Sequence, residues 1–279
     1  KKNVFSIANE KISFIENKLT IEKTPNYYKP DCFKPLCIKS DKEISYLIMK
    51  IDNIYIFKLP LSFSNKLLNK PDKVNDYYLY FIPWNKFNLE ELPIISLHQD
   101  IQFIIKSESI CNADLYFENI YYEKKKRIEL SQKQYEIFVR QYQEQNAQIK
   151  NNESINLIFN GDINGIFLDN INISQIKSIK LLLAGYVKIN YDKSMIDLFT
   201  KNIFDNCIYI PFDNKDYNDI LLDGSSINFD RLDNIKIVFE TENNNIQNIK
   251  IRTFNHNLLI IKNNMAKILN GLVDQSDNM

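Results

Sequence analysis

The sequence is short of the residues that most catalytic and metal-binding sites use. Its 279 residues include 2 His, 4 Cys, 5 Gly and 1 Trp. The cysteines, Cys32, Cys37, Cys111 and Cys207, lack metal-type spacing, so we predict small buried thiols in a reducing compartment. Two histidines are too few for the usual zinc sites, and no Gly-rich phosphate loop is present. We therefore predict a protein that is not an enzyme and that holds no cofactor or metal.

An excess of one charge and a long apolar run are missing as well. The 35 Lys and Arg residues balance the 35 Asp and Glu residues, which gives a formal net charge of zero. A protein whose main function is to bind nucleic acid or an anionic membrane needs an excess of basic residues, so we do not expect those functions. No apolar run approaches the roughly 18 residues of a membrane span, and we expect neither such a span nor a signal peptide.

The residues that are abundant favour β-strands. There are 44 Ile residues, aromatic residues make up 13% of the chain, and hydrophobic residues make up 44%. Short apolar or alternating runs recur about every ten residues with turn residues between them and without interleaved helices. This pattern predicts an all-β fold, either a sandwich, a jelly roll or a barrel. Predicted strands include one or two over residues 45–60, single strands over 92–105, 113–122 and 179–191, and a hairpin over 154–169.

Two regions do not follow this pattern. Residues 1–45 have weak periodicity and contain Pro25, Pro30 and Pro35, so we predict irregular loop there. Residues 123–150 lack Gly and Pro and are rich in helix formers, yet YEIFVRQYQ within them alternates with period two. Propensity favours a helix and periodicity favours a strand, and the residues alone leave both open.

Several polar groups could carry chemistry, but each has a simpler structural explanation. His98 and Asp100 could share one face of a strand, and His256 lies in a strand-like run, so we expect both histidines to be satisfied within a sheet. The acidic series from Asp213 to Asp223 lacks the spacing of a calcium loop. We expect that series, and the basic run Lys124–Arg127, to be solvated loop and turn.

Four short segments carry a more specific signal. They are LPIISLHQDIQF from Leu92, LSQKQYEIFVRQ from Leu130, SINFDRLDN from Ser226 and RTFNHNLLIIKNNM from Arg252. Three of the four arginines, Arg127, Arg231 and Arg252, lie at positions of these motifs in a chain that otherwise uses Lys, which indicates positions that need a planar guanidinium. The residues at motif positions are Leu92, Pro93, Leu97, Gln132, Glu136, Gln141, Asn228, Phe229, Arg231, Asp233, Arg252, Asn255 and Asn257.

In this order the segments resemble motifs of the double-jelly-roll major capsid proteins of nucleocytoplasmic large DNA viruses. The resemblance covers about residues 77–265 and implies two jelly rolls in tandem, residues 1–133 with the linker and residues 134–279. It implies a helical turn over Arg127–Gln132 as the linker and a first strand of the second roll over Tyr135–Gln145. The first roll is expected to lack its strands before about Ser45, as in a fragment or a divergent member.

The function implied by the resemblance is structural. Three copies would form a pseudo-hexagonal capsomer that tiles an icosahedral shell in the virion and is assembled in the host cytoplasm. The implied partners are neighbouring capsomers or minor capsid proteins, without direct contact to nucleic acid, near an internal viral membrane. Two alternatives stay open, a minor capsid or scaffold protein of the same fold and a carbohydrate-binding β-sandwich. A sandwich lectin usually exposes an aromatic platform, whereas we expect Trp84 to be buried.

Arg231 has two possible environments. It lies two residues from Asp233, which would place both side chains on one face of an extended segment. An exposed pair with Asp230 or Asp233 would contribute under about 1 kcal/mol. The sharper hypothesis is a half-buried guanidinium that ties this segment to the final strand or to an adjacent subunit.

Overall fold

The chain consists of two compact units that are built almost entirely from antiparallel strands. The computed structural model describes residues 2–11, 16–21, 30–61, 72–81, 84, 89, 91–109, 111–199, 201–204, 206–212, 226–243 and 246–269. The first unit is formed by Lys1–Gln141 together with Asn257–Met279, and the second unit is Tyr142–His256. The chain therefore passes from one unit to the other twice, between Gln141 and Tyr142 and between His256 and Asn257.

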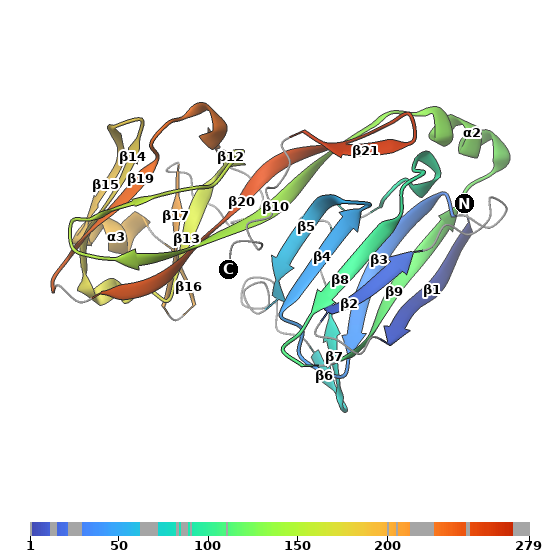
Figure 1. The fold of residues 1–279 in the computed structure, drawn as a ribbon, viewed down its shortest axis with the longest axis horizontal. Helices are drawn as coiled ribbons and strands as arrows, with labels where there is room; N and C mark the ends of the chain where they lie inside the picture. Colours follow the sequence, from blue (N-terminus) through green and yellow to red (C-terminus); the bar gives the residue numbers. More distant parts are fainter. Residues whose placement is uncertain are drawn as a thin grey trace. The chain divides into compact units, whose positions relative to one another are not determined.

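The first unit contains two sheets (Figure 1). One has the strand order β1-β9-β3-β7-β6 and the other the order β2-β8-β4-β5, and all neighbours are antiparallel. The strands are β1 (Lys2–Lys11), β2 (Glu16–Ile21), β3 (Cys32–Ser40), β4 (Tyr46–Ile51), β5 (Ile54–Pro60), β6 (Asp72–Val74), β7 (Tyr77–Tyr80), β8 (Ile101–Lys106) and β9 (Asn112–Tyr121).

The connectivity of these strands is that of a jelly roll. If the short strand β6 is left aside, these two sheets contain eight strands in chain order. The first strand pairs with the eighth, the eighth with the third and the third with the sixth, whereas the second pairs with the seventh, the seventh with the fourth and the fourth with the fifth. Two four-stranded antiparallel sheets connected in this way make a complete jelly roll.

The second unit repeats the same order. Its sheets contain the paths β10-β20-β13-β17 and β11-β19-β14-β15, with β16, β12 and β18 as additional short strands. β21 pairs with the end of β20 that belongs to the first unit. β10 and β20 are long and reach into the first unit. The strands are β10 (Tyr135–Ile149), β11 (Ser154–Asn156), β12 (Asp162–Ile163), β13 (Gly165–Asp169), β14 (Ile176–Leu183), β15 (Tyr186–Asp192), β16 (Lys201–Phe204), β17 (Cys207–Pro211), β18 (Ile227–Asn228), β19 (Lys236–Thr241), β20 (Gln247–Lys262) and β21 (Met265–Ile268).

Each unit has its own apolar core, built by strands that alternate buried and half-buried residues. In β19 the buried positions are Ile237, Phe239 and Thr241, because successive side chains of a strand point to opposite faces. In the first unit Phe33 contacts Phe103, with ring centroids 5.8 Å apart. Trp84 is 5% exposed and packs edge-on against Phe103, so its expected burial is confirmed.

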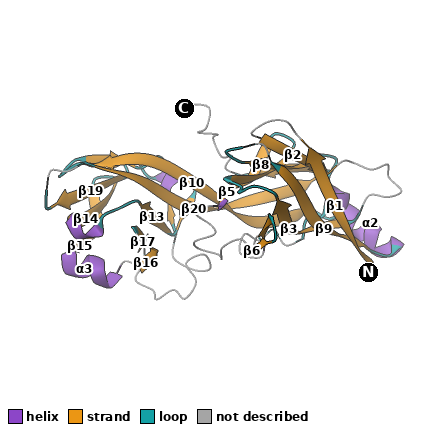
Figure 2. Cartoon of the chain, turned by 90° about the horizontal axis from the view of Figure 1, so that it is seen from below, coloured by secondary structure: helices purple, strands orange, loops and turns teal. Residues whose placement is uncertain are grey.

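Helices are few in the described part of the chain (Figure 2). α2 (Lys124–Gln132) follows β9, and α3 (Lys193–Phe199) follows β15. The 3-10 turns η2 (Ile94–Ser96), η3 (Ile173–Gln175) and η4 (Phe229–Arg231) lie in connections. None of the helices described is long and apolar enough to span a membrane.

The expected absence of strands before Ser45 is wrong, because β1, β2 and β3 all precede that residue. β1 pairs with β9 over its whole length, β2 pairs with β8, and β3 pairs with β9 and β7. Pro35, which suggested a loop, lies in β3 where the register with β9 shifts between Pro35 and Cys37. Prolines are tolerated in sheets at such irregularities. The first roll is therefore complete.

Other predictions were confirmed or corrected in detail. Residues 45–60 form β4 and β5, and β9 confirms the strand predicted over 113–122. Residues 92–105 are not one strand, because η2 precedes β8. The strand predicted over 179–191 is a hairpin of β14 and β15 that turns at Ala184 (φ 50°) and Gly185 (φ 85°).

The regions around residues 123–150 and 154–169 have defined structures. The helical turn predicted over Arg127–Gln132 and the strand predicted over Tyr135–Gln145 are confirmed by α2 and β10, which settles the conflict between propensity and periodicity. The hairpin predicted over 154–169 is wrong, because β11 pairs with β19, and β13 pairs with β17 and β20. The predicted boundary at residue 133 falls just after α2, whereas the compact units divide at Gln141. That residues 1–133 and 134–279 behave as separate domains stays a prediction.

Candidate functional site

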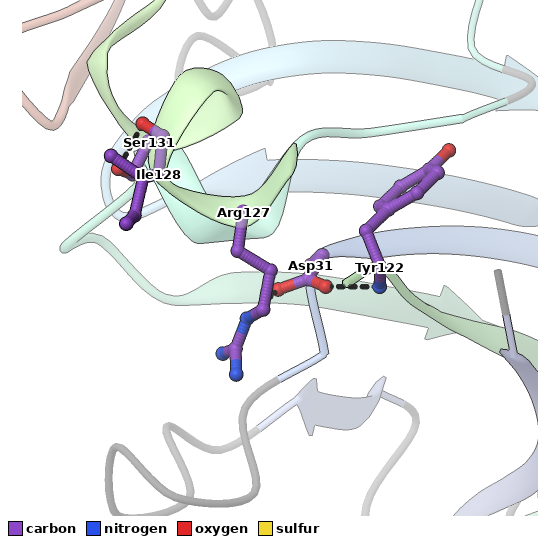
Figure 3. A network of polar contacts seen from close by, with 5 residues as sticks. All are labelled: Asp31, Tyr122, Arg127, Ile128 and Ser131. Carbon is purple, nitrogen blue, oxygen red and sulfur yellow. Dashed lines mark hydrogen bonds and ion pairs between the residues drawn. The ribbon is translucent and has the colours of Figure 1, made fainter. Parts of the chain in front are cut away.

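The linker helix α2 is anchored to the first unit by an ion pair. Arg127 Nε lies 2.7 Å from Asp31 Oδ1, and the Asp31 side chain is fully buried. The second carboxylate oxygen of Asp31 accepts a hydrogen bond from the backbone N–H of Tyr122 at 2.5 Å (Figure 3). Asp31 thus joins the end of β9 to the first half of α2. The terminal nitrogens of Arg127 point away from this contact.

α2 needs such anchors because it has little stability of its own. None of its residues is buried, and Glu123 at its N-terminus makes no side-chain capping bond. A nine-residue helix is marginal in water, and lysines in its first turn oppose the helix dipole. At its other end the Leu130 carbonyl accepts hydrogen bonds from Ser96 Oγ at 2.8 Å and from Tyr135 Oη at 3.1 Å. Burial raises the pKa of Tyr135.

The segment from Leu92 to Leu97 brings Ser96 to this helix. Leu92, Pro93 and Leu97 are all buried. Leu92 exchanges two backbone hydrogen bonds with Phe33, at 2.8 and 2.9 Å. The segment is therefore a turn fixed against β3, and it carries the serine that holds the linker.

A second cluster surrounds Gln141 and Asn257. Asn257 Nδ2 donates a hydrogen bond to Gln141 Oε1 at 2.8 Å, and both side chains are buried. Gln141 Nε2 in turn donates to the carbonyls of Tyr55 at 3.1 Å and of Ile56 at 3.3 Å on β5. These residues all belong to the first unit.

Within the second unit, residues of β10, β13 and β20 form a buried ionic cluster. Arg252 Nη1 lies 2.7 Å from Asp169 Oδ2, and Arg252 Nε lies 3.8 Å from Glu144 Oε2. The side chain of Arg252 is 8% exposed and that of Asp169 is 11% exposed. Glu144 also accepts a hydrogen bond from Tyr142 Oη at 2.6 Å. An arginine is suited to this place because its fork reaches two carboxylates at once.

The SINFDRLDN segment forms β18 and η4 rather than one extended strand. Asn228 Oδ1 accepts a hydrogen bond from the Arg231 backbone N–H at 3.2 Å and so caps the turn. Phe229 is buried and stacks on Phe212, with ring centroids 5.9 Å apart. Arg231 and Asp233 are exposed. The half-buried guanidinium tied to the final strand is therefore wrong, and a contact of Arg231 with an adjacent subunit stays a prediction.

Asn255 packs beside the turn η4. It is 1% exposed, and its side chain lies against Gly161, where an added Cβ would stand 2.6 Å from Asn255 Nδ2. Gly161 has φ +78°, a conformation that other residues rarely adopt. Its carbonyl accepts the backbone N–H of Phe229 at 2.9 Å, so Asn255, Gly161 and η4 pack together.

The remaining candidates do not form a chemical site. Gln132 and Glu136 are exposed, and the motif residues as a whole lie in separate clusters. His98 is exposed before β8 rather than on a strand, whereas His256 lies half-buried in β20 opposite Asp162. The four cysteines form no disulfide; Cys32, Cys111 and Cys207 are buried as predicted, whereas Cys37 is half-buried. Lys124–Arg127 is the first half of α2 rather than a turn.

No grouping of metal-ligating side chains occurs in the described part of the chain. The acidic series from Asp213 to Asp223 lies outside the described residues.

Sequence reasoning did not find several residues on which these clusters depend. Asp31 lies in a region predicted to be irregular, Ser96 lies in the first motif segment but was not singled out, and Gln143 and Asp169 lie outside the motif segments. Their partners lie far away in the sequence: Arg127 is 96 residues from Asp31. One signal was present, since the rare arginines Arg127 and Arg252 both pair with such carboxylates.

Comparisons with known proteins find the same architecture. No family model and no curated protein matches the sequence. The fold resembles the PBCV-1 virus capsid, in a quasi-atomic model, with a TM-score of 0.72 and 12% identity over 96% of this chain and 97% of that one. The Faustovirus major capsid protein gives a TM-score of 0.62 and 7% identity over 94% and 90% of the two chains. The major capsid protein P2 of bacteriophage PM2 gives 0.53 and 12% over 96% and 100%. Together with the repeated strand order, this likeness shows that the chain has the double jelly-roll fold.

Proposed function

We propose that the chain is a structural capsid protein whose three copies assemble into a pseudo-hexagonal capsomer. The observation that carries the proposal is the repetition of one eight-strand order in both units, in a fold that aligns with viral and phage capsid proteins over nearly its whole length. Strand order alone would suit many jelly rolls. The pairing of two such rolls in one chain is what favours a capsid function.

The trimer follows from the duplication. Two similar rolls per chain give six similar rolls in a three-fold ring, and a near-hexagonal block tiles a flat surface with few kinds of contact. Such an assembly is permanent, and interfaces of permanent assemblies bury roughly 2,000–5,000 Å². The partners proposed are other copies of this chain, neighbouring capsomers and minor capsid proteins, in the virion, after assembly in the host cytoplasm.

We include in the proposal that the protein has no enzyme activity and does not bind nucleic acid directly. A balanced charge of 35 basic and 35 acidic residues agrees with this.

The direct test is the mass of the purified chain in solution. The proposal expects a particle of three times 33.1 kDa by size exclusion with light scattering, unchanged over a range of micromolar concentrations. A monodisperse monomer would count against it. The location of a trimer then separates a coat protein from a scaffold protein of the same fold: a coat protein remains in mature purified virions, whereas a scaffold protein is present only in particles that are still assembling.

A further inference from the structure

The two places where the chain passes between its units are joined by side chains. Gln141 is the last residue of the first unit on β10, and Asn257 is the first residue of that unit on β20 after the chain returns. Their amides hydrogen-bond at 2.8 Å. Gln141 is fully buried, and Asn257 is 4% exposed.

The same pair is attached to β5, an edge strand of its sheet. The register between β4 and β5 runs from Met49 opposite Phe57 to Lys50 opposite Tyr55, and it skips Ile56. Ile56 is thus the extra residue of a β-bulge, whose backbone groups are not used by the ladder. Gln141 Nε2 donates to the carbonyls of Tyr55 and Ile56, so its amide fills the bulge.

The polar atoms of the pair form a chain of hydrogen bonds in which each has a partner. Gln141 Nε2 binds two carbonyls and Gln141 Oε1 accepts from Asn257. Asn257 Oδ1 accepts from the backbone N–H of Leu258 at 2.8 Å. Fully satisfied buried polar networks rigidify the segments that they join, and the loss of one member leaves buried groups unpaired.

The residues that follow are held just as firmly within the second unit. The Tyr142 ring packs edge-on against Phe254, with centroids 5.7 Å apart. Gln143 exchanges two hydrogen bonds with Asn160, at 2.8 and 3.1 Å. On β10 a residue anchored in the first unit is therefore followed at once by residues anchored in the second.

We propose that Gln141 and Asn257 form a clasp that fixes the point at which β10 and β20 leave the first unit, and that capsomer assembly requires this clasp. The inference rests on the proposed function, because a ring of six rolls closes only if every chain presents its two rolls in one fixed arrangement. A pair of amides that merely stabilised the first roll would affect stability but not assembly.

The test compares two identical substitutions on one strand in the full-length chain. Gln141→Met removes the clasp. Gln143→Met removes a buried amide whose two hydrogen bonds are with Asn160, within the second unit. Hydrogen exchange is measured on peptides covering residues 138–145 and 254–260, and the oligomeric state is measured by light scattering. The clasp predicts that Gln141→Met raises exchange in both peptides about tenfold relative to Gln143→Met and converts trimers to folded monomers.

Equal exchange and equal assembly in the two variants would overturn the clasp. If Gln141→Met does not fold, Asn257→Ser provides the same test. It removes the hydrogen bond between Asn257 and Gln141 and keeps the bonds of Gln141 to β5. A wild-type chain that is monomeric would refute the proposed trimer, whereas the exchange comparison would still decide whether the clasp exists.

Discussion

Arg127 Nε donates to Asp31 Oδ1 across 2.7 Å, and the carboxylate that it meets is fully buried. A buried carboxylate is costly unless it is paired and hydrogen-bonded, so this contact decides where the linker helix lies. The donor is Nε, an atom for which lysine has no equivalent. The use of arginine at this position, in a chain with 31 Lys and 4 Arg, has a geometric reason.

Arg127→Lys should therefore lower the free energy of unfolding by about 1–2 kcal/mol, because a lysine cannot reproduce the short Nε contact without moving α2. Chemical denaturation of the full chain measures the change. The matched control is Arg231→Lys, whose side chain is exposed and which should change stability by less than about 0.5 kcal/mol. Equal effects of the two substitutions would contradict the anchoring of α2 by Arg127.

Two glycines with positive φ provide a test of the packing around Asn255, because only Gly161 lies against that residue. Gly161→Ala should cost about 2–4 kcal/mol, since it combines a φ of +78° with an added Cβ only 2.6 Å from Asn255 Nδ2. Gly185→Ala should cost about 1 kcal/mol, because its φ is +85° but the space around it is open. Thermal melting of both variants gives the comparison, and a smaller loss at Gly161 than at Gly185 would refute the packing described here.

The buried pair of Arg252 and Asp169 should contribute far more than an exposed pair. Asp169→Asn keeps the shape of the side chain but removes the charge opposite a guanidinium that is 8% exposed, and we expect a loss of about 2–4 kcal/mol. Glu153→Gln, which breaks an exposed pair with Lys150 at 3.2 Å, should cost under about 0.5 kcal/mol. Urea unfolding curves distinguish the two, and similar midpoints would argue against an ionic cluster in the second core.

Helix α3 should respond to acid through Asp192. The backbone N–H of Met195 donates to Asp192 Oδ1 at 2.9 Å, and this bond, together with Ser194, holds the pKa of Asp192 below its ordinary value. A carboxylate whose pKa is lowered by folding stabilises the folded state above its unfolded pKa. That contribution is lost as the pH falls through the lowered value.

Exchange of the α3 amides should accordingly increase as the pH falls through this window, after correction for the intrinsic pH dependence of exchange. Asp192→Asn retains an acceptor without a charge, so the acid response should disappear in this variant. An unchanged acid response in Asp192→Asn would assign it to another group.

The strands that the sequence predicted best are those with local, regular patterns. β9, predicted over 113–122, alternates buried Ala113, Leu115 and Phe117 with half-buried neighbours, and such a pattern needs no knowledge of its partners. β1, β2 and β3 were missed because their pairing partners, β8 and β9, lie far along the chain. The turn between β14 and β15 was missed because Ala184 adopts φ 50° without being a usual turn residue.

The contacts that hold α2, and those between β10 and β20, could be predicted only in part. Matching the motif segments singled out Gln141 and Asn257, and the scarcity of arginine singled out Arg127 and Arg252. The contacts themselves connect residues such as Gln141 and Asn257 that are 116 positions apart. Pairings at this distance depend on the strand order, which no local pattern contains.

Electron microscopy of the purified full-length chain tests the central claim most directly. If the chain is a capsomer subunit with two jelly rolls, two-dimensional class averages should show particles with three-fold symmetry and a six-sided outline, and each particle should contain three chains. Single two-lobed particles, or dimers with two-fold symmetry, at concentrations where the protein is folded would contradict the account.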